Sequence, residues 1–260
     1  MLIKPEQPSH WYKSDGTPAY GSTLREARRD GLYPSVTSIS QVIQKPAIEA
    51  WKQNLLMETM YESVIDSDWW CAYNPEHVKK TIICEWKENM SAAAELGTKV
   101  HDAIEGMTVD DDSWVGTDME PYCLAVRDWM EKNIINNHIP EACFAHPLGF
   151  GGRVDLYGEW GKRQRPFVLD YKTQGKPGDK MVFYPDMAIQ LAANAAGVGS
   201  LDGDLVSVLL STVEPGELRY KCWGDDPKRN NEYWLARFIN RCRVWADEKN
   251  YWPVPLEELR

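Results

Sequence analysis

Two aspartates and a lysine lie at the ends of two strand-like runs in the middle of the chain. Residues 152–173 read GRVDLYGEWGKRQRPFVLDYKT, with Asp155 in the first run and Asp170 and Lys172 at the end of the second. Because side chains alternate faces along a strand, Asp170 and Lys172 point to the same side. If the two runs pair as a hairpin, all three side chains converge on one spot.

Two carboxylates beside an ammonium group can support metal-assisted cleavage of a phosphodiester bond. Carboxylate oxygens are hard ligands that suit Mg²⁺ or Mn²⁺. Such a cation polarises a phosphate and activates water, and the ammonium group can orient that water or stabilise the developing negative charge. A D-x-K sequence taken alone is more commonly explained by a structural salt bridge on one strand face.

Three further polar residues fall in chain positions that suit the same site. His101 and Glu105 lie one helical turn apart in LGTKVHDAIE, and Gln190 lies in the helix expected after the D-x-K strand. The imidazole can complete the coordination of a divalent ion, and Glu105 can hold the ring or meet a second metal. Gln190 can contact substrate or hold a metal-site carboxylate. The alternatives are a core histidine, an exposed helix acid and an ordinary polar helix position.

The order of predicted elements indicates an α/β (α+β) fold with a central mixed sheet flanked by helices. Apolar spacing and capping residues predict helices over residues 24–30, 38–44, 46–64, 76–89, 91–105, 118–137, 184–198 and 229–248. Period-two patterns predict strands near residues 141–147, 150–158, 166–172, 204–212 and 217–223. Ser35 or Thr37 is expected to cap the second helix and Ser91 the fifth.

Composition limits the functional classes that fit. The net charge of −10 argues against a passive nucleic-acid coat protein but not against a nuclease, because bound cations neutralise an acidic metal site. The six cysteines form no C-x-x-C pair, so we expect reduced, buried thiols rather than a zinc or iron–sulfur site. The sequence contains no apolar run of membrane-spanning length and no signal sequence, so we expect a cytoplasmic protein without a membrane partner.

The set of motifs resembles the PD-(D/E)xK nuclease superfamily. The order is G-x-x-x-H, G-R-V-D, L-D-Y-K-T and then a helix with glutamine, preceded by PSVTSISQVIQKPAIEAW. It is most similar to the RecB-like exonuclease branch, which includes phage exonucleases and the mitochondrial genome maintenance exonuclease. The resemblance covers residues 33–195 and implies a restriction-endonuclease-like core with an N-terminal helical lobe. We therefore expect residues 1–90 to form a DNA-contacting arm and lobe, and residues 91–260 to form the nuclease core, within one continuous structural unit.

The resemblance assigns roles to individual residues. It implies that the catalytic residues are Asp155, Asp170, Lys172 and Gln190. It also implies that the metal ligands are His101, Asp155, Asp170 and the backbone carbonyl of Tyr171, with Glu105 as a further candidate.

The sequence departs from the family pattern at three points. Val154 precedes the first acid where the family has proline, and Asn194 replaces the tyrosine of Q-x-x-x-Y. The first change leaves the carboxylate intact, whereas the second puts the role of that helix in doubt. The four-cysteine iron–sulfur cluster of some relatives is absent.

The expected function is that of a Mg²⁺- or Mn²⁺-dependent DNA exonuclease of the phage recombination or replication type, acting in the host cytoplasm if phage-encoded. A single-strand annealing recombinase is a candidate partner. The alternatives are a structure-specific endonuclease, an inactive DNA-binding accessory protein, and a hydrolase of small phosphate esters. Candidate DNA contacts are Ser35, Thr37, Trp51, Arg153 and Thr173, with Trp69 and Trp70 as further stacking candidates.

Overall fold

A computed structural model describes residues 10–43, 45–65, 75–133, 135–161, 164–226 and 228–259. The chain divides into two compact units, which we call the sheet unit (residues 1–43 and 102–260) and the helical unit (residues 44–101). The boundary between them falls inside one long helix, as does the boundary expected at residue 90.

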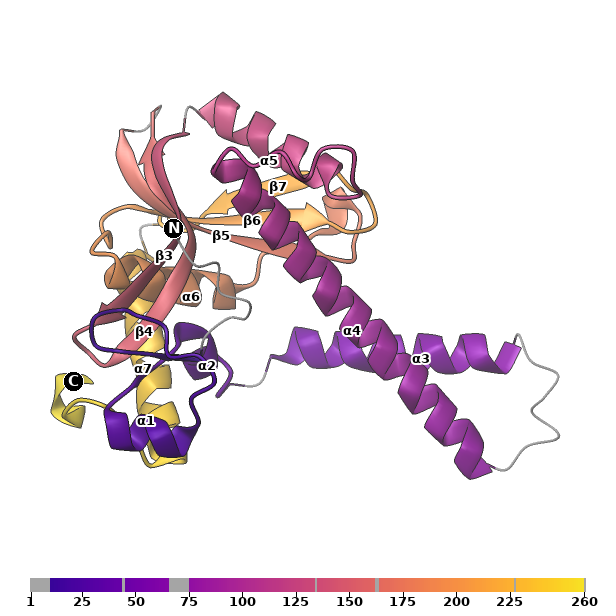
Figure 1. Ribbon diagram of the computed structural model, residues 1–260, viewed down its shortest axis with the longest axis horizontal. Helices are drawn as coiled ribbons and strands as arrows, with labels where there is room; N and C mark the ends of the chain where they lie inside the picture. The colour runs from indigo at the N-terminus through magenta and orange to yellow at the C-terminus, as the bar shows by residue number, and fades with distance from the viewer. Residues whose placement is uncertain are drawn as a thin grey trace. The chain divides into compact units, whose positions relative to one another are not determined.

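A five-stranded mixed sheet forms the centre of the sheet unit (Figure 1). The strands lie in chain order and are β3 (Ile135–His146), β4 (Phe150–Trp160), β5 (Arg165–Gln174), β6 (Asp204–Ser211) and β7 (Leu218–Cys222). Neighbouring strands are antiparallel except β5 and β6, which are parallel. A parallel pair needs a crossover connection, and α6 (Pro185–Gly197) supplies it. This confirms the predicted mixed sheet flanked by helices.

Helices cover both faces of this sheet. On one face, α6 contacts β3 to β6 and packs against α7 (Asn231–Lys249). Helix α5 (Glu120–Asn133) covers the other face (Figure 1). Its Trp129 contacts the rings of Trp160 and Tyr220. Strand β6 is buried along its whole length, because both its faces are covered and both its edges are paired. The apolar run DLVSVLLS is the sequence expected for such a central strand.

The N-terminal part of the sheet unit packs beside β4 and α7. It contains β1 (Trp11–Tyr12), α1 (Leu24–Asp30), β2 (Tyr33–Pro34) and α2 (Val36–Ser40). Ser35 caps α2, as predicted, by accepting a hydrogen bond from the backbone N–H of Ser38. Two short 3₁₀ helices complete the unit, η2 (Gly178–Lys180) and η3 (Leu256–Leu259). The two short strands β1 and β2 were not predicted.

The helical unit consists of α3 (Pro46–Ile65) and the N-terminal part of α4 (Pro75–Thr108). The sequence prediction of two helices, ending at 89 and starting at Ser91, is wrong, because α4 is continuous. Asn89 does not break the helix, since its side chain donates a hydrogen bond to Thr59 of α3. Ser91 does not act as a cap, and its hydroxyl bonds to Glu95 within the same helix.

Two other predictions need correction. The helix expected over 118–137 ends at Asn133, and β3 begins at Ile135 rather than near 141, because β3 pairs with β4 as far as Ile135 opposite Trp160. The cysteines are free thiols wherever described, but Cys84 and Cys143 are exposed rather than buried. Cys71, Trp69 and Trp70 lie outside the described residues. None of the helices in the described part of the chain is long and apolar enough to cross a membrane.

Candidate active site

Asp155 and Asp170 each lie one residue beyond the end of the β4–β5 ladder. The last pair of that ladder is Leu156 with Leu169. Oδ2 of Asp155 accepts a hydrogen bond from the backbone N–H of Tyr171, with an oxygen–nitrogen distance of 2.8 Å. The carboxylate thus takes the place of a backbone acceptor and is fixed next to Asp170.

Lys172 lies on the same face of β5 as Asp170, as the strand alternation predicts. Its Nζ is 2.6 Å from Oδ1 of Asp170 and 3.2 Å from the carbonyl oxygen of Tyr171. Asp170 is only 2% exposed, whereas the Lys172 side chain is 36% exposed. The ammonium group therefore neutralises a buried carboxylate while keeping access to solvent.

The charges around Lys172 hold it in the protonated form. Burial alone would lower its pKa, because a desolvated ammonium is disfavoured. The negative charges of Asp170 and Asp155, together with the hydrogen bond to Asp170, outweigh burial and raise the pKa above its ordinary value. Lys172 is thus a persistent cation near neutral pH and not a free amine base.

Helix α6 supplies a third contact to Asp170. The side-chain amide of Gln190 donates a hydrogen bond to Oδ1 of Asp170 at 3.2 Å. This contact corresponds to one of the two roles considered for Gln190, that of holding a carboxylate of the site. Asn194, one turn further along α6, is 2% exposed, and its Oδ1 lies beside Gly152 of β4. Asn194 therefore lies in the α6–β4 interface.

The oxygen atoms brought together here suit a hard cation. They are the carboxylates of Asp155 and Asp170 and the main-chain carbonyl of Tyr171. The Lys172 ammonium donates hydrogen bonds to both Asp170 and this carbonyl. Oxygen ligands of this type suit Mg²⁺ and Mn²⁺. Among the residues that the structure describes, no group of three or more His, Cys, Asp or Glu side chains could hold a metal ion. The donor set assembled at this spot is therefore two carboxylates and one backbone oxygen.

The two further metal-ligand candidates both lie on α4. His101 is half-buried and is the last residue of the helical unit, so its role as a ligand stays a prediction. Glu105 is half-buried and belongs to the sheet unit. Its charge, like that of Asp155, raises the pKa of Glu141, so Glu105 lies within electrostatic reach of β3.

The predicted DNA contacts occupy several different environments. The Ser35 hydroxyl is buried and donates to Oγ of Ser38 in addition to capping α2, whereas Thr37 is exposed on that helix. Trp51 is 43% exposed on α3 in the helical unit. Thr173 is half-buried on β5, and Arg153 is paired with Glu141. The structure therefore gives Ser35 and Arg153 internal partners.

Glu141 was not among the site residues predicted from the sequence. This residue lies in β3, forms an ion pair with Arg153 of β4, and interacts electrostatically with Asp155. The signal was available in the register of the β3–β4 hairpin. Pairing His146 with Phe150 across the short turn places Glu141 opposite Asp155 when the register is counted back along both strands. The strand was predicted to begin near residue 141, so Glu141 was expected at its end and not in its interior.

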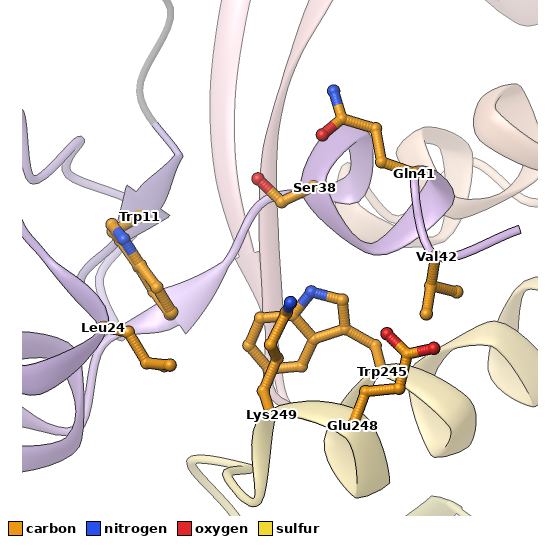
Figure 2. Close-up of a pocket in the computed structure, with 8 residues that line it drawn as sticks. All are labelled: Trp11, Leu24, Ser38, Gln41, Val42, Trp245, Glu248 and Lys249. Carbon is orange, nitrogen blue, oxygen red and sulfur yellow. The ribbon is translucent and has the colours of Figure 1, made fainter.

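A pocket of about 400 Å³ lies elsewhere in the sheet unit, between α1, α2 and α7 (Figure 2). Its lining residues are Trp11, Leu24, Ser38, Gln41, Val42, Trp245, Glu248 and Lys249. Two buried tryptophans form its apolar part, and Ser38, Gln41 and the ends of Glu248 and Lys249 form its polar part (Figure 2). None of the predicted catalytic residues lines this pocket.

Comparisons with known proteins give weak structural likenesses only. No protein-family model matches the sequence, and neither does any curated protein. A crystal structure of SSO0001 is similar at a TM-score of 0.33 and 13% identity, covering 74% of this chain and 85% of that one. An alkaline exonuclease, LHK-Exo, from Laribacter hongkongensis is similar at a TM-score of 0.41 and 15% identity, covering 87% of this chain and 91% of that one. TM-scores this low assign no activity to the chain, so its function has to be argued from its own residues.

Proposed function

We propose that this chain is a divalent-metal-dependent deoxyribonuclease, and specifically an exonuclease that hydrolyses phosphodiester bonds. The observation that carries the proposal is one hydrogen-bonded arrangement on β4 and β5. It runs from Asp155 to the Tyr171 N–H, and from the Tyr171 carbonyl through the Lys172 ammonium to Asp170. This arrangement contains the carboxylates and the cation that the chemistry requires, and the PD-(D/E)xK resemblance assigns the same residues.

The carboxylates are the proposed ligands. Asp155, Asp170 and the Tyr171 carbonyl would hold Mg²⁺ or Mn²⁺, with His101 and Glu105 as further ligand candidates. When bound, the cation would polarise the scissile phosphate and activate water. Asp155 needs little reorganisation, because the Tyr171 N–H already orients it. The Gln190 amide restrains Asp170 in the same way.

Lys172 has an electrostatic role in this proposal. Its raised pKa keeps the ammonium charged, so it can offset the negative charge that builds on phosphate and can orient the attacking water. Its partial exposure lets it reach substrate without leaving β5. A persistent ammonium cannot take a proton from water, so proton removal has to be assigned to another group.

A nuclease assay tests this proposal. Purified protein with Mg²⁺ or Mn²⁺ should release nucleotides from end-labelled linear DNA, and EDTA should stop the release. Asp170→Asn and Lys172→Met should each reduce the rate by at least about 100-fold, which is typical for loss of one charge-stabilising group. Lys180→Met is the matched control, because Lys180 is an exposed lysine outside this arrangement. Undiminished digestion by both site variants would refute the assignment of these residues.

The same assay separates the alternatives. Digestion of closed circular DNA at the rate of linear DNA would identify an endonuclease. DNA binding without digestion under any metal would identify an inactive accessory protein. Preference for a nucleotide monoester over DNA would identify a small phosphate-ester hydrolase. Substrates labelled at the 5′ or the 3′ end, in single-stranded and double-stranded form, would establish the direction of digestion and the strand preference.

A further inference from the structure

Glu141 faces the proposed site from the neighbouring strand β3. Its neighbours Pro140 and Ala142 pair with Leu156 and Val154, so the register places Glu141 directly across from Asp155. Glu141 has a φ of 55°, in the left-handed region that residues other than glycine rarely adopt. A non-glycine residue in this conformation costs of order 1–3 kcal/mol, so the surrounding structure has to stabilise it.

Arg153 is a potential competitor for Asp155. Both residues lie on β4, two positions apart, so their side chains start from the same face about 7 Å apart. An arginine can reach over this distance and bind a carboxylate through two parallel hydrogen bonds, the strongest pairing available to either group. Such a pair would neutralise the charge that Asp155 needs as a ligand for a cation.

The structure pairs Arg153 with Glu141 instead. Nε of Arg153 and Oε2 of Glu141 form an ion pair between β4 and β3, with side chains 28% and 19% exposed. Burial alone would lower the pKa of Arg153, but the negative charges of Glu141 and Asp155 raise it, so the guanidinium remains charged. Burial raises the pKa of Glu141 to about 8, with Asp155 and Glu105 adding to the rise and Arg153 opposing it.

We propose that Glu141 is a positioning residue, which holds the Arg153 guanidinium in a pair with itself and so prevents it from pairing with Asp155. This inference rests on the proposed function, because it assigns Asp155 the task of binding a cation. It also explains why a half-buried arginine lies two residues from a proposed metal ligand.

Two measurements on the full chain test the proposal. A metal-free crystal structure of Glu141→Gln should show the Arg153 guanidinium within hydrogen-bond distance of Asp155. Isothermal titration calorimetry should show Mn²⁺ affinity reduced by about tenfold in Glu141→Gln, the scale seen when a partner of a metal ligand is removed. Adding Arg153→Gln should restore the affinity to within about twofold of wild type, the scatter expected for independent sites.

The controls separate this inference from the proposed function. Arg153→Gln alone should leave Mn²⁺ affinity at or above the wild-type value, which gives a result even if Glu141→Gln does not fold. Asp170→Asn should lose Mn²⁺ binding. A wild-type chain that binds no Mn²⁺ would refute the metal site. In that case the crystal structure of Glu141→Gln would still show whether Arg153 moves to Asp155. An unmoved guanidinium, an unchanged affinity in Glu141→Gln, or no recovery in the double variant would overturn the role of Glu141.

Discussion

The ion pair between Lys172 and Asp170 allows a quantitative prediction. Lys172→Met removes the ammonium group and keeps the aliphatic chain. Asp170 then stays buried and keeps the hydrogen bond from the neutral Gln190 amide, but it loses the positive charge of Lys172. Breaking a fully buried pair costs about 3–5 kcal/mol, and an exposed pair contributes about 0–1 kcal/mol. Because the Lys172 side chain is 36% exposed, solvent screens the pair, and we expect a loss of about 2 kcal/mol in the free energy of unfolding.

A double-mutant cycle isolates this pair. Asp170→Asn should cost about 1 kcal/mol, because Lys172 can turn to water. Asp170→Asn/Lys172→Met should cost less than the sum of the single changes, with a coupling energy of about 1–2 kcal/mol. Urea unfolding followed by circular dichroism measures all four proteins. A coupling energy below about 0.3 kcal/mol, the limit of additivity for independent sites, would refute the ion pair.

The pH dependence of the cycle follows from the raised pKa of Lys172. A lysine whose pKa is higher in the folded than in the unfolded chain contributes its stabilisation fully below the unfolded value, about 10.4. The contribution is lost only as pH rises through the folded value, which lies higher still. The Lys172 side of the coupling should therefore be constant from neutral pH to the unfolded lysine pKa and then decrease.

Three further predictions address other parts of the sheet unit. Burial raises the pKa of Glu141 to about 8, whereas in the unfolded chain this carboxyl loses its proton near pH 4.3. The free energy of unfolding should therefore fall as pH rises from about 4.3 to about 8. In a pH series of urea unfolding curves, Glu141→Gln should flatten this fall. Gly197→Ala should destabilise the fold by about 1–3 kcal/mol in thermal unfolding, because its Cβ would lie 2.0 Å from the Phe144 ring. Ser35→Ala should lower the free energy of unfolding by about 1 kcal/mol, because α2 loses its cap, and it should leave DNA affinity unchanged. A loss of DNA affinity without a loss of stability would indicate a direct DNA contact.

The part of the site that the sequence could predict is the part that depends on local geometry. Asp170 and Lys172 share a face because strand side chains alternate. Asp155 reaches β5 because the β4–β5 hairpin places it one residue beyond the pair of Leu156 with Leu169. The Gln190 contact could be anticipated in outline, since a helix connecting two parallel strands has to pack on the sheet. For these residues, counting positions along short connections was sufficient.

The remaining contacts depended on features that local patterns do not encode. The position of Glu141 follows from the β3–β4 register, but no residue pattern indicates its positive φ at a glutamate after proline. Helix α4 continues through Asn89 and Ser91, and the Asn89 side chain donates a hydrogen bond to Thr59, thirty residues away in sequence. Tertiary contacts outweighed the local preference of asparagine and serine for helix ends.

Three neighbouring strands bring acidic residues close together, Glu141 from β3, Asp155 from β4 and Asp170 from β5. The charge of Asp155 raises the pKa of both Glu141 and Lys172, so it lies within electrostatic reach of both. Like charges on neighbouring strands are destabilising, so this arrangement requires compensation. The structure supplies basic partners, Arg153 for Glu141 and Lys172 for Asp170, and a backbone N–H that donates to Asp155. A bound divalent cation would reduce the repulsion between Asp155 and Asp170, which gives a physical reason for the proposed metal site.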